Sequence, residues 1–308
     1  AKTMIDSFII VFKQVFILFF LILIGFICGK VGFFKESAAK AMSDLVLYLA
    51  TPCVIIAAFQ REFDPAFLLN LGIAALCAGL IYAVSILLCK GIFRGEKNGE
   101  QRVLEFGTVF SNCGFMALPL QVAVLGQDGA FYGAGFLVAF NIFFWTYGVK
   151  TMAGQGFKIT PKKLLLNPGL IGVAVGVLLF VCSISLPELL SAPIGYMGNL
   201  NTPLPMIVIG FYLAKANLKR TFKCGKAYVS FLLRLVVIPL LALLVMSLCG
   251  VPQTVKVAVV IAASAPVAAG TTMFSAKYNA DTELSVSLVS ASTLLSIITM
   301  PVIVALSF

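Results

Sequence analysis

The stretch EFGTVFSNCGFMALPLQVAVLG, residues 105–126, is mostly apolar after its first residue, Glu105, and contains polar and small residues in its middle. The run is long enough to cross a bilayer. The residues that interrupt its centre are Ser111, Asn112, Cys113 and Gly114. Pro119 follows seven residues after Asn112, and proline removes a helical hydrogen-bond donor. We therefore predict a membrane-spanning helix that is broken near its centre.

A second stretch, in the other half of the chain, has the same character: VAVVIAASAPVAAGTTMFSAKYN, residues 257–279. Its centre holds Ser264, Pro266 and Gly270 within an apolar run. Two helices broken at the same depth can cross there. At such a crossing the positive N-termini of the half-helices attract an anion, and the freed carbonyls can hold a cation. A simple kink is the alternative interpretation of each stretch, because Gly and Pro are common in membrane helices.

The polar and flexible positions of the two stretches form the candidate site. The amide of Asn112 is suited to donate hydrogen bonds to a carboxylate. The candidate substrate-binding residues are Ser111, Asn112, Cys113, Gly114, Asn141, Ala265, Pro266 and Val267, and the candidate helix breaks are Pro119, Pro266 and Gly270. Further candidates for lining a cavity or holding an ion are Thr51, Thr202, Ser292 and Thr293. Hydrogen bonds between helices are the more ordinary role of such hydroxyls.

The composition of the whole chain indicates a membrane protein. Of 308 residues, 61% are hydrophobic and 11% are charged, whereas an ordinary soluble domain has about 25% charged residues. We predict ten hydrophobic segments, roughly 8–29, 44–60, 66–89, 103–125, 129–149, 163–183, 199–214, 227–249, 254–275 and 283–306. The segments lack the alternation of a porin-type barrel. The expected fold class is therefore an all-α polytopic membrane protein with ten transmembrane helices.

The net charge of +10 is unevenly distributed along the chain. Of the 22 Lys and Arg residues, 17 lie in the loops after segments one, three, five, seven and nine, and four lie on the opposite side. Cytoplasmic loops carry the excess of cations in membrane proteins. We therefore expect a multi-pass protein of the cell (inner) membrane with both termini extracytoplasmic. Nucleic acid is not expected as a partner, because the cations serve topology in this interpretation.

The two halves of the chain resemble each other at an offset of about 151 to 153 residues. Asp128 aligns with Asp281, and the Thr-Pro pair at Thr51 aligns with the one at Thr202. Because each half holds five segments, the second copy must enter the membrane in the opposite orientation. This inverted repeat is typical of secondary transporters, whose sites lie near the midplane where discontinuous helices meet.

Enzymatic chemistry finds little support in the sequence. The chain has no histidine, which excludes imidazole metal sites, Ser-His-Asp triads and histidine proton relays. None of the eight cysteines pairs at the spacing of a zinc or redox motif. The 12 acidic residues lie near predicted segment ends or in loops, so no proton carrier is expected at mid-depth. We expect no catalytic residue, no cofactor and no metal.

These residues resemble the auxin efflux carrier family, which comprises bacterial organic-acid permeases and the plant PIN-type auxin carriers. The resemblance covers the whole chain. It is most specific in the NCGFMALP stretch from Asn112 to Pro119 and in the stretch from Pro266 to Asn279. The plant members have proline where this chain has Ser111, which implies a softer or shifted break. Many plant members also have a long central loop that is missing here, and this favours the bacterial type.

The resemblance implies two five-helix inverted repeats with a scaffold and a transport unit that moves in the manner of an elevator. The implied repeats are 1–150 and 151–308, the scaffold is about 8–60 and 163–214, and the transport unit is about 66–149 and 227–306. Family members move carboxylate-bearing solutes and often form homodimers. The residue similar to Asn112 holds the carboxylate in the plant carriers.

The sequence thus predicts a secondary transporter of small organic anions, auxin-like or malate- or malonate-like, with the lipid bilayer and a second copy of the chain as partners. A sodium- or proton-coupled symporter for another amphipathic anion and a channel or receptor on this fold are the alternatives. Arg234 lies inside segment eight, eight residues beyond Lys226, which is about 12 Å along a helix. Snorkelling to the cytoplasmic surface is its favoured interpretation, and interior pairing and direct anion contact are the alternatives.

Overall fold

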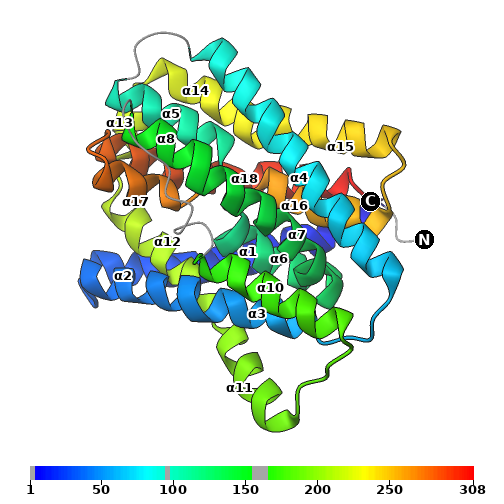
Figure 1. Ribbon diagram of the computed structural model, residues 1–308. Coiled ribbons are helices and arrows are strands. Elements are labelled where there is room, and N and C mark those ends of the chain that lie inside the picture. Colours follow the sequence, from blue (N-terminus) through cyan, green and yellow to red (C-terminus); the bar gives the residue numbers. More distant parts are fainter. Residues whose placement is uncertain (1–3, 94–97, 155–165) are drawn as a thin grey trace.

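The computed structural model describes residues 4–93, 98–154 and 166–308, in which the regular structure is helical (Figure 1). The first half contains α1 (Met4–Lys30), α2 (Glu36–Leu45), η1 (Val46–Ala50), α3 (Thr51–Ala58), α4 (Pro65–Ile92), α5 (Gly99–Val109), η2 (Cys113–Ala117), α6 (Leu118–Leu125), α7 (Gln127–Phe143), η3 (Phe144–Gly148) and α8 (Val149–Ala153). The second half contains α10 (Pro168–Val181), α11 (Glu188–Asn199), α12 (Pro203–Lys215), α13 (Leu218–Phe222), α14 (Gly225–Leu232), η4 (Leu233–Val237), α15 (Ile238–Leu248), α16 (Gln253–Ser264), α17 (Gly270–Lys277) and α18 (Thr282–Ala305). The label η marks a π-helical turn. The predicted start of segment six, at 163, falls outside the described residues.

Within the described residues, each predicted segment overlaps a helix or successive helices, and segment nine also contains the break between α16 and α17. Within the described ranges, the helices long and apolar enough to cross a bilayer are Phe8–Lys30, Glu36–Ala58, Pro65–Ile92, Gln127–Ala153, Gly225–Leu248 and Thr282–Ala305. Shorter apolar helices are Cys113–Leu125, Pro168–Val181 and Gln253–Ser264. The all-helical class and the apolar, multi-pass character are confirmed. Ten crossings in two inverted repeats remain a prediction.

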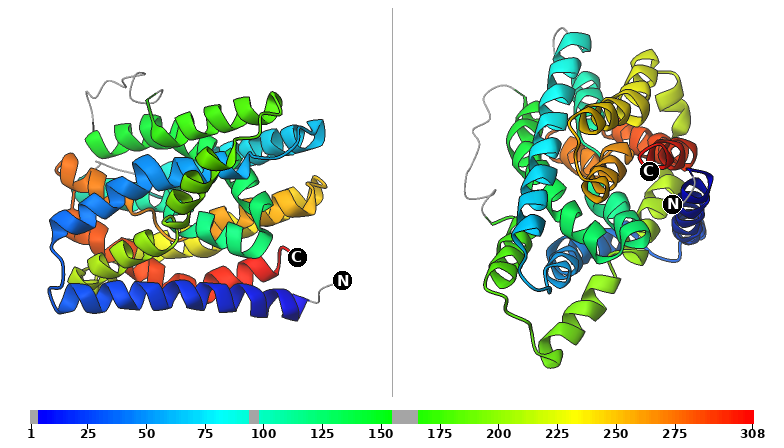
Figure 2. Two further views of the ribbon diagram at one scale, coloured as in Figure 1. Left: turned by 90° about the horizontal axis from the view of Figure 1, so that it is seen from below. Right: turned by 90° about the vertical axis from the view of Figure 1, so that its right-hand side faces the viewer.

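Most of the helices run side by side along one direction, and the two termini lie at the same end of the bundle (Figure 2). The exterior carries large apolar side chains. On α1, Phe20 is 56% exposed, and on α4, Leu76 is 65% exposed. Exposure of such apolar patches to water is unfavourable, whereas contact with lipid chains is favourable. The bundle therefore presents a surface for the hydrocarbon core of a membrane.

Three of the four π-helical turns in the described residues precede a proline by the same spacing. Pro52, Pro119 and Pro239 each stand two residues after the end of a π-helical turn, which are η1, η2 and η4 respectively. A proline ring clashes with the carbonyl four residues earlier and supplies no N–H to it. Because a π-helical turn is wider, it moves that carbonyl away from the ring. These prolines therefore widen a turn without ending the helix.

Two glycines allow α1 and α12 to pack backbone against backbone. A Cβ atom at Gly25 would lie 2.1 Å from the carbonyl oxygen of Ile207, and one at Gly210 would lie 1.9 Å from that of Ile22. Only glycine fits at such distances, and small residues are typical of contacts between membrane helices. α1 and α12 pack together along much of their length, while α3 packs against α10 and α11.

The sequence does not predict α11, which projects from the body of the molecule (Figure 1). This helix is too short to cross a bilayer and contains Pro193 in its interior, so it lacks the signal of a membrane segment. Predicted segment seven begins where α11 ends, and the apolar helix at that place, α12, begins four residues later at Pro203. Leu189 and Tyr196 of α11 are 85% and 74% exposed.

Candidate functional site

Two helices are interrupted at the places that the sequence indicates. α5 ends at Val109 and α16 ends at Ser264, and the chain continues in extended conformation after each of them. An isolated antiparallel bridge joins Ser111 to Val267. The helices resume as η2 followed by α6 in the first half and as α17 in the second half. The structure therefore contains the predicted contact between the two breaks.

Backbone hydrogen bonds hold the two extended pieces together. The N–H of Asn112 donates to the carbonyl of Pro266 at 2.7 Å, and the N–H of Ala268 donates to the carbonyl of Phe110 at 2.9 Å. These bonds satisfy backbone groups that a helix break would otherwise leave unpaired in an apolar interior. The crossing is therefore a fixed feature of the backbone.

The residues predicted as breaks lie at different places around this crossing. Pro266 is in the extended piece itself. Gly270 begins α17, where a Cβ atom would lie 2.6 Å from the ring of Phe144. Pro119 lies in the first turn of α6, beyond the break, and continues the helix. The first interruption thus lies at Phe110 to Asn112, well before the proline.

Several buried polar atoms around the crossing have no hydrogen-bond partner. They are the side-chain Oγ of Ser111, Nδ2 of Asn112, Oγ1 of Thr271 and hydroxyl oxygen of Tyr82. Tyr82, from α4, lies near the side chains of Ser111 and Cys113 without forming a hydrogen bond of normal geometry to either. A buried polar group without a partner costs about 1–3 kcal/mol. Their concentration at one place is typical of a ligand-binding site.

Tyr82 is a site residue that the sequence does not reveal. It lies in the middle of the apolar helix α4, about 30 residues before the break in the chain. Its ring is fully buried among those of Phe110, Phe136 and Phe143. A tyrosine within an apolar segment is usually a packing residue. Only the contact of α4 with the crossing distinguishes Tyr82 from an ordinary packing tyrosine.

The start of the first resumed half-helix presents backbone donors. No hydrogen bond of the described residues uses the N–H groups of Cys113, Gly114 or Phe115. Gly114 and Phe115 are partly exposed, so the first turn is accessible from outside the protein interior. A Cβ atom at Gly114 would approach nothing closer than 3.9 Å. Free N–H groups at a helix start bind anions, aided by the helix dipole.

Arg234 lies at the C-terminal ends of α5 and α16, where these helices are interrupted. Its Nη1 donates to the carbonyls of Thr108 at 3.3 Å and Val109 at 3.0 Å, and its Nη2 donates to the carbonyl of Ala263. The side chain is 1% exposed. Snorkelling to the surface is therefore wrong, and interior pairing is the correct alternative, with carbonyls as the partners. The cations near Arg234 in the sequence favour a surface position. The sequence does not show that the carbonyls of α5 and α16 pack against η4, so the buried position could not be predicted.

Among the hydroxyls of α18, Ser292 touches the crossing. Its Oγ accepts a hydrogen bond from the N–H of Val267 at 3.2 Å and donates to the carbonyl of Val289. Thr293 donates to the same carbonyl within its own helix. Ser292 therefore supports the second break, whereas Thr293 has the ordinary role of a helix hydroxyl.

The other candidates lie away from the crossing contacts. Asn141, in α7, donates to the carbonyl of Leu137 in its own helix and is buried against the start of α10 near Gly169. Thr51 donates to the side-chain oxygen of Asn201 at 2.8 Å and thereby links the first half of the chain to the second. Thr202 is the N-cap residue of α12 and makes no side-chain cap bond. The structure does not bring these candidates to the crossing.

One acid is buried although it lies near the start of a predicted segment. Glu105, in α5, is fully buried and accepts a hydrogen bond from the hydroxyl of Tyr147. The ring of Tyr147 also has the ammonium group of Lys90 at 5.8 Å from its centroid. In the sequence, Glu105 lies close to the start of segment four. Its partner Tyr147 is 42 residues away, so no local pattern predicts that Glu105 is buried.

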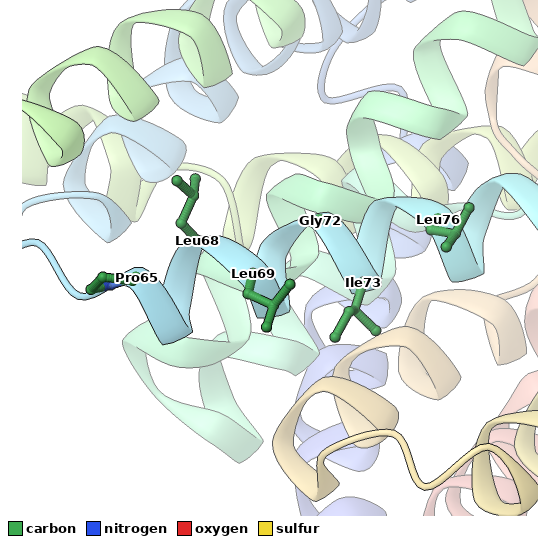
Figure 3. Close-up of a pocket in the computed structure, with 6 residues that line it drawn as sticks. All are labelled: Pro65, Leu68, Leu69, Gly72, Ile73 and Leu76. Carbon is green, nitrogen blue, oxygen red and sulfur yellow. The ribbon is translucent and has the colours of Figure 1, made fainter.

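A shallow groove on the outside of the bundle is separate from this site (Figure 3). Its lining comes entirely from one face of α4, and the residues are Pro65, Leu68, Leu69, Gly72, Ile73 and Leu76. The lining offers no polar side chain. A groove of this kind suits lipid chains, and it has no group that could select a polar solute.

Broken helices that meet at a shared crossing inside an apolar bundle are typical of membrane transport proteins. The sequence profile of the family described as "Membrane transport protein" matches residues 10–304, and the chain belongs to this family, the auxin efflux carrier family. An uncharacterized transporter of Methanocaldococcus jannaschii is 24% identical over 297 residues, which cover 92% of this chain and 94% of the relative. An uncharacterized transporter of Methanothermobacter thermautotrophicus is 24% identical over 290 residues, covering 91% and 93%.

Proposed function

We propose that this protein is a secondary transporter of small organic anions, mono- or dicarboxylates, and that the carboxylate binds at the crossing. The observation that carries the proposal is the Nδ2 atom of Asn112, which is buried at the crossing without a partner. An amide nitrogen only donates, so the group that completes it is an acceptor. A carboxylate is an acceptor with room for about four hydrogen bonds.

Further donors surround the same place. The free N–H groups of Cys113, Gly114 and Phe115 add backbone donors, and the hydroxyls of Ser111 and Tyr82 can donate as well. These groups come from α4, from the first break itself and from the half-helix that follows it. Donors that are fixed in place before the ligand arrives cost little reorganisation on binding. The arrangement favours an anion with two oxygens over a neutral solute or a cation.

Movement of the bound anion is expected to follow an elevator-type alternating access. α1 packs along α12, and α3 packs against α10 and α11, which fits a scaffold. α4 packs against α7 and α16 and, together with the crossing, fits a separate transport unit. In this proposal the transport unit carries the crossing across the membrane, while two scaffolds associate as a homodimer. Both termini are extracytoplasmic in the cell (inner) membrane.

Uptake into proteoliposomes tests the proposal. Labelled malate, malonate and an indole carboxylate are offered to vesicles that contain the wild type, Asn112→Ala or Asn141→Ala. Because a hydrogen bond to a charged group contributes about 1.5–3 kcal/mol, Asn112→Ala is expected to weaken uptake by about tenfold or more. Asn141→Ala is the matched control, since this amide is also buried but bonds to its own helix. Uptake in the wild type should saturate, whereas a channel would not saturate at modest concentration.

Equal uptake by the wild type and Asn112→Ala would remove Asn112 from the site. Absence of saturable uptake for every acid would refute the proposed class of substrate. The two outcomes are separate, because the second concerns the wild type alone.

A further inference from the structure

Arg234 carries a permanent positive charge, and no acid in the described part of the chain forms an ion pair with it. The ion pairs among the described residues join Arg61 to Asp128, Lys215 to Glu36, and Arg220 to both Glu100 and Asp281. Arg234 belongs to none of them. The titratable side chains that interact with it electrostatically are Tyr82, Cys89 and Cys113, and none of these is a carboxylate. Burying an unpaired guanidinium is costly, so something else must compensate its charge.

The ends of the interrupted helices provide that compensation. Each helix C-terminus carries about half a negative elementary charge, and those of α5 and α16 both lie against the guanidinium. Together they amount to about one negative charge. The guanidinium donates directly to carbonyls in the last turn of both helices, where these charges reside. Arg234 and the two C-termini are therefore close to neutral as a group.

The N-termini at the crossing then remain without compensation. The starts of η2 and α17 carry about half a positive charge each, or about one positive charge in total. Without Arg234, the four helix ends at the crossing would cancel, and a bound carboxylate would leave one negative charge in a medium of low dielectric constant. With Arg234 present, one bound carboxylate makes the whole site neutral.

Freed carbonyls at half-helix C-termini are also the groups that coordinate a coupling sodium ion in transporters with broken helices. Here the carbonyls of Thr108, Val109 and Ala263 already accept from the guanidinium. A sodium ion at this place would have to share these oxygens with a like charge. The Nε–H of Arg234 still has no partner and is available to an anion.

We propose that Arg234 is a resident counter-cation that takes the place of a coupling sodium ion at the crossing, so that carboxylate binding does not depend on sodium. The inference rests on the proposed function, since it concerns the charge that accompanies the carboxylate. Arg234 acts as a positioning residue in this scheme. It fixes both helix ends and sets the charge of the site.

The first test uses the wild-type protein in detergent. Its thermal stability is titrated with malate, malonate and an indole carboxylate, each as the sodium, the potassium and the choline salt at one ionic strength. Ligand binding raises the apparent stability, so each titration gives an affinity. We expect the affinity for the acid that binds to agree within about twofold among the three salts. Binding that requires sodium would overturn the inference and leave the proposed function intact, whereas no binding of any acid in any salt would overturn both.

The second test uses Arg234→Gln and Arg234→Lys, with Lys277→Gln as the control because Lys277 is an exposed cation at the end of α17. Removing a buried charge that serves an anion site should weaken affinity by about 30-fold or more in Arg234→Gln. Arg234→Lys should lose less, because it keeps the charge. Low concentrations of guanidinium ion should restore affinity in Arg234→Gln and not alter the control.

Restoration by guanidinium distinguishes a charge at the site from a purely structural role. Wild-type affinity in folded Arg234→Gln, or no restoration by guanidinium in that folded variant, would overturn the inference. If Arg234→Gln does not fold, the affinity of Arg234→Lys and the comparison of salts in the wild type still test the inference.

Discussion

The break in the first half of the chain and the break in the second half contribute different groups to the crossing. Ser111 and Asn112, at the first break, carry polar side-chain atoms without a partner. The second break runs from Ala265 to Ala268 and has only small apolar side chains and a proline. Its backbone is held by Ser292 from α18. We infer that the first break binds the solute, while the second break is a rigid, closely packed support for the first.

This division of roles also fits the surroundings of the glycines. A Cβ atom at Gly114, beside the first break, would make only an ordinary contact with Leu137 at 3.9 Å, whereas one at Gly270 would lie 2.6 Å from the ring of Phe144. The first break leaves room for a ligand, and the second is closely packed. Substitutions that affect the two breaks in opposite ways therefore test the comparison.

The largest effect is expected from Asn112→Asp, because it replaces the amide donor by a carboxylate of nearly the same size. Like charges placed together cost several kcal/mol, so binding of an organic anion should fall by about a hundredfold or more. Asn141→Asp applies the same change at a buried asparagine that bonds to its own helix. Titration of thermal stability with malonate measures both. An unchanged affinity in Asn112→Asp would place the anion elsewhere.

Gly270→Ala should lower stability by about 1–3 kcal/mol, because the added methyl group meets a ring that cannot easily move. The ring of Phe144 packs against those of Phe106, Phe110 and Phe274. Gly114→Ala has space for its methyl group and gains helix propensity of up to about 1 kcal/mol. Thermal unfolding in detergent compares the two. Equal destabilisation would contradict the claim that only the second break is tightly packed.

A pair of serine substitutions separates recognition from support. Ser292→Ala removes a hydrogen bond to the N–H of Val267 and should cost about 1–2 kcal/mol of stability with little change in affinity. Ser111→Ala removes a hydroxyl that has no partner, so it should leave stability unchanged or raise it while lowering affinity. Unfolding temperatures and ligand titrations of both variants show which serine supports the fold and which binds the ligand. A reversed pattern would exchange the roles of the two breaks.

The smallest effects are expected at two arginines that form ion pairs, Arg61 within the first half of the chain and Arg220 within the second. Arg61 is 18% exposed, pairs with Asp128 at 2.7 Å and lies 4.8 Å from the ring centroids of both Phe67 and Phe131. Arg220 is 38% exposed and pairs with Asp281 at 2.6 Å. Exposed ion pairs contribute about 0–1 kcal/mol, and each cation–π contact adds about 0.5–1 kcal/mol. Arg61→Ala should therefore destabilise more than Arg220→Ala, as thermal unfolding in detergent will show.

The crossing could be predicted from the sequence because its cause is local. Polar residues and proline within an apolar run interrupt a helix, and this interruption is visible at Asn112 and at Pro266. The existence of both breaks was therefore accessible from the sequence alone. Their exact positions were less so, because Pro119 lies in a regular turn and the first interruption is seven residues earlier, at Asn112.

The partners of the crossing could not be predicted, because they are distant in the sequence. Tyr82 is within an ordinary apolar helix, and Arg234 resembles one more cation near a basic loop. The roles of both follow from how α4 and η4 pack against the breaks. Glu105 is likewise buried by Tyr147, which comes from another helix. Tertiary contacts decide such assignments, and no local pattern encodes them.

The π-helical turns have a consequence for the length of the chain. Each of these turns accommodates one more residue than an α-helical turn, and one residue corresponds to about 100° of rotation around the axis. Deleting a residue between Leu233 and Val237 would allow a regular helix to form. Because the π-helical turn absorbs that residue locally, the side chains on both sides of the deletion would keep their neighbours. The same deletion in the regular turns of α15 would rotate one part of the helix by about 100° against the other and turn lipid-facing side chains toward the interior.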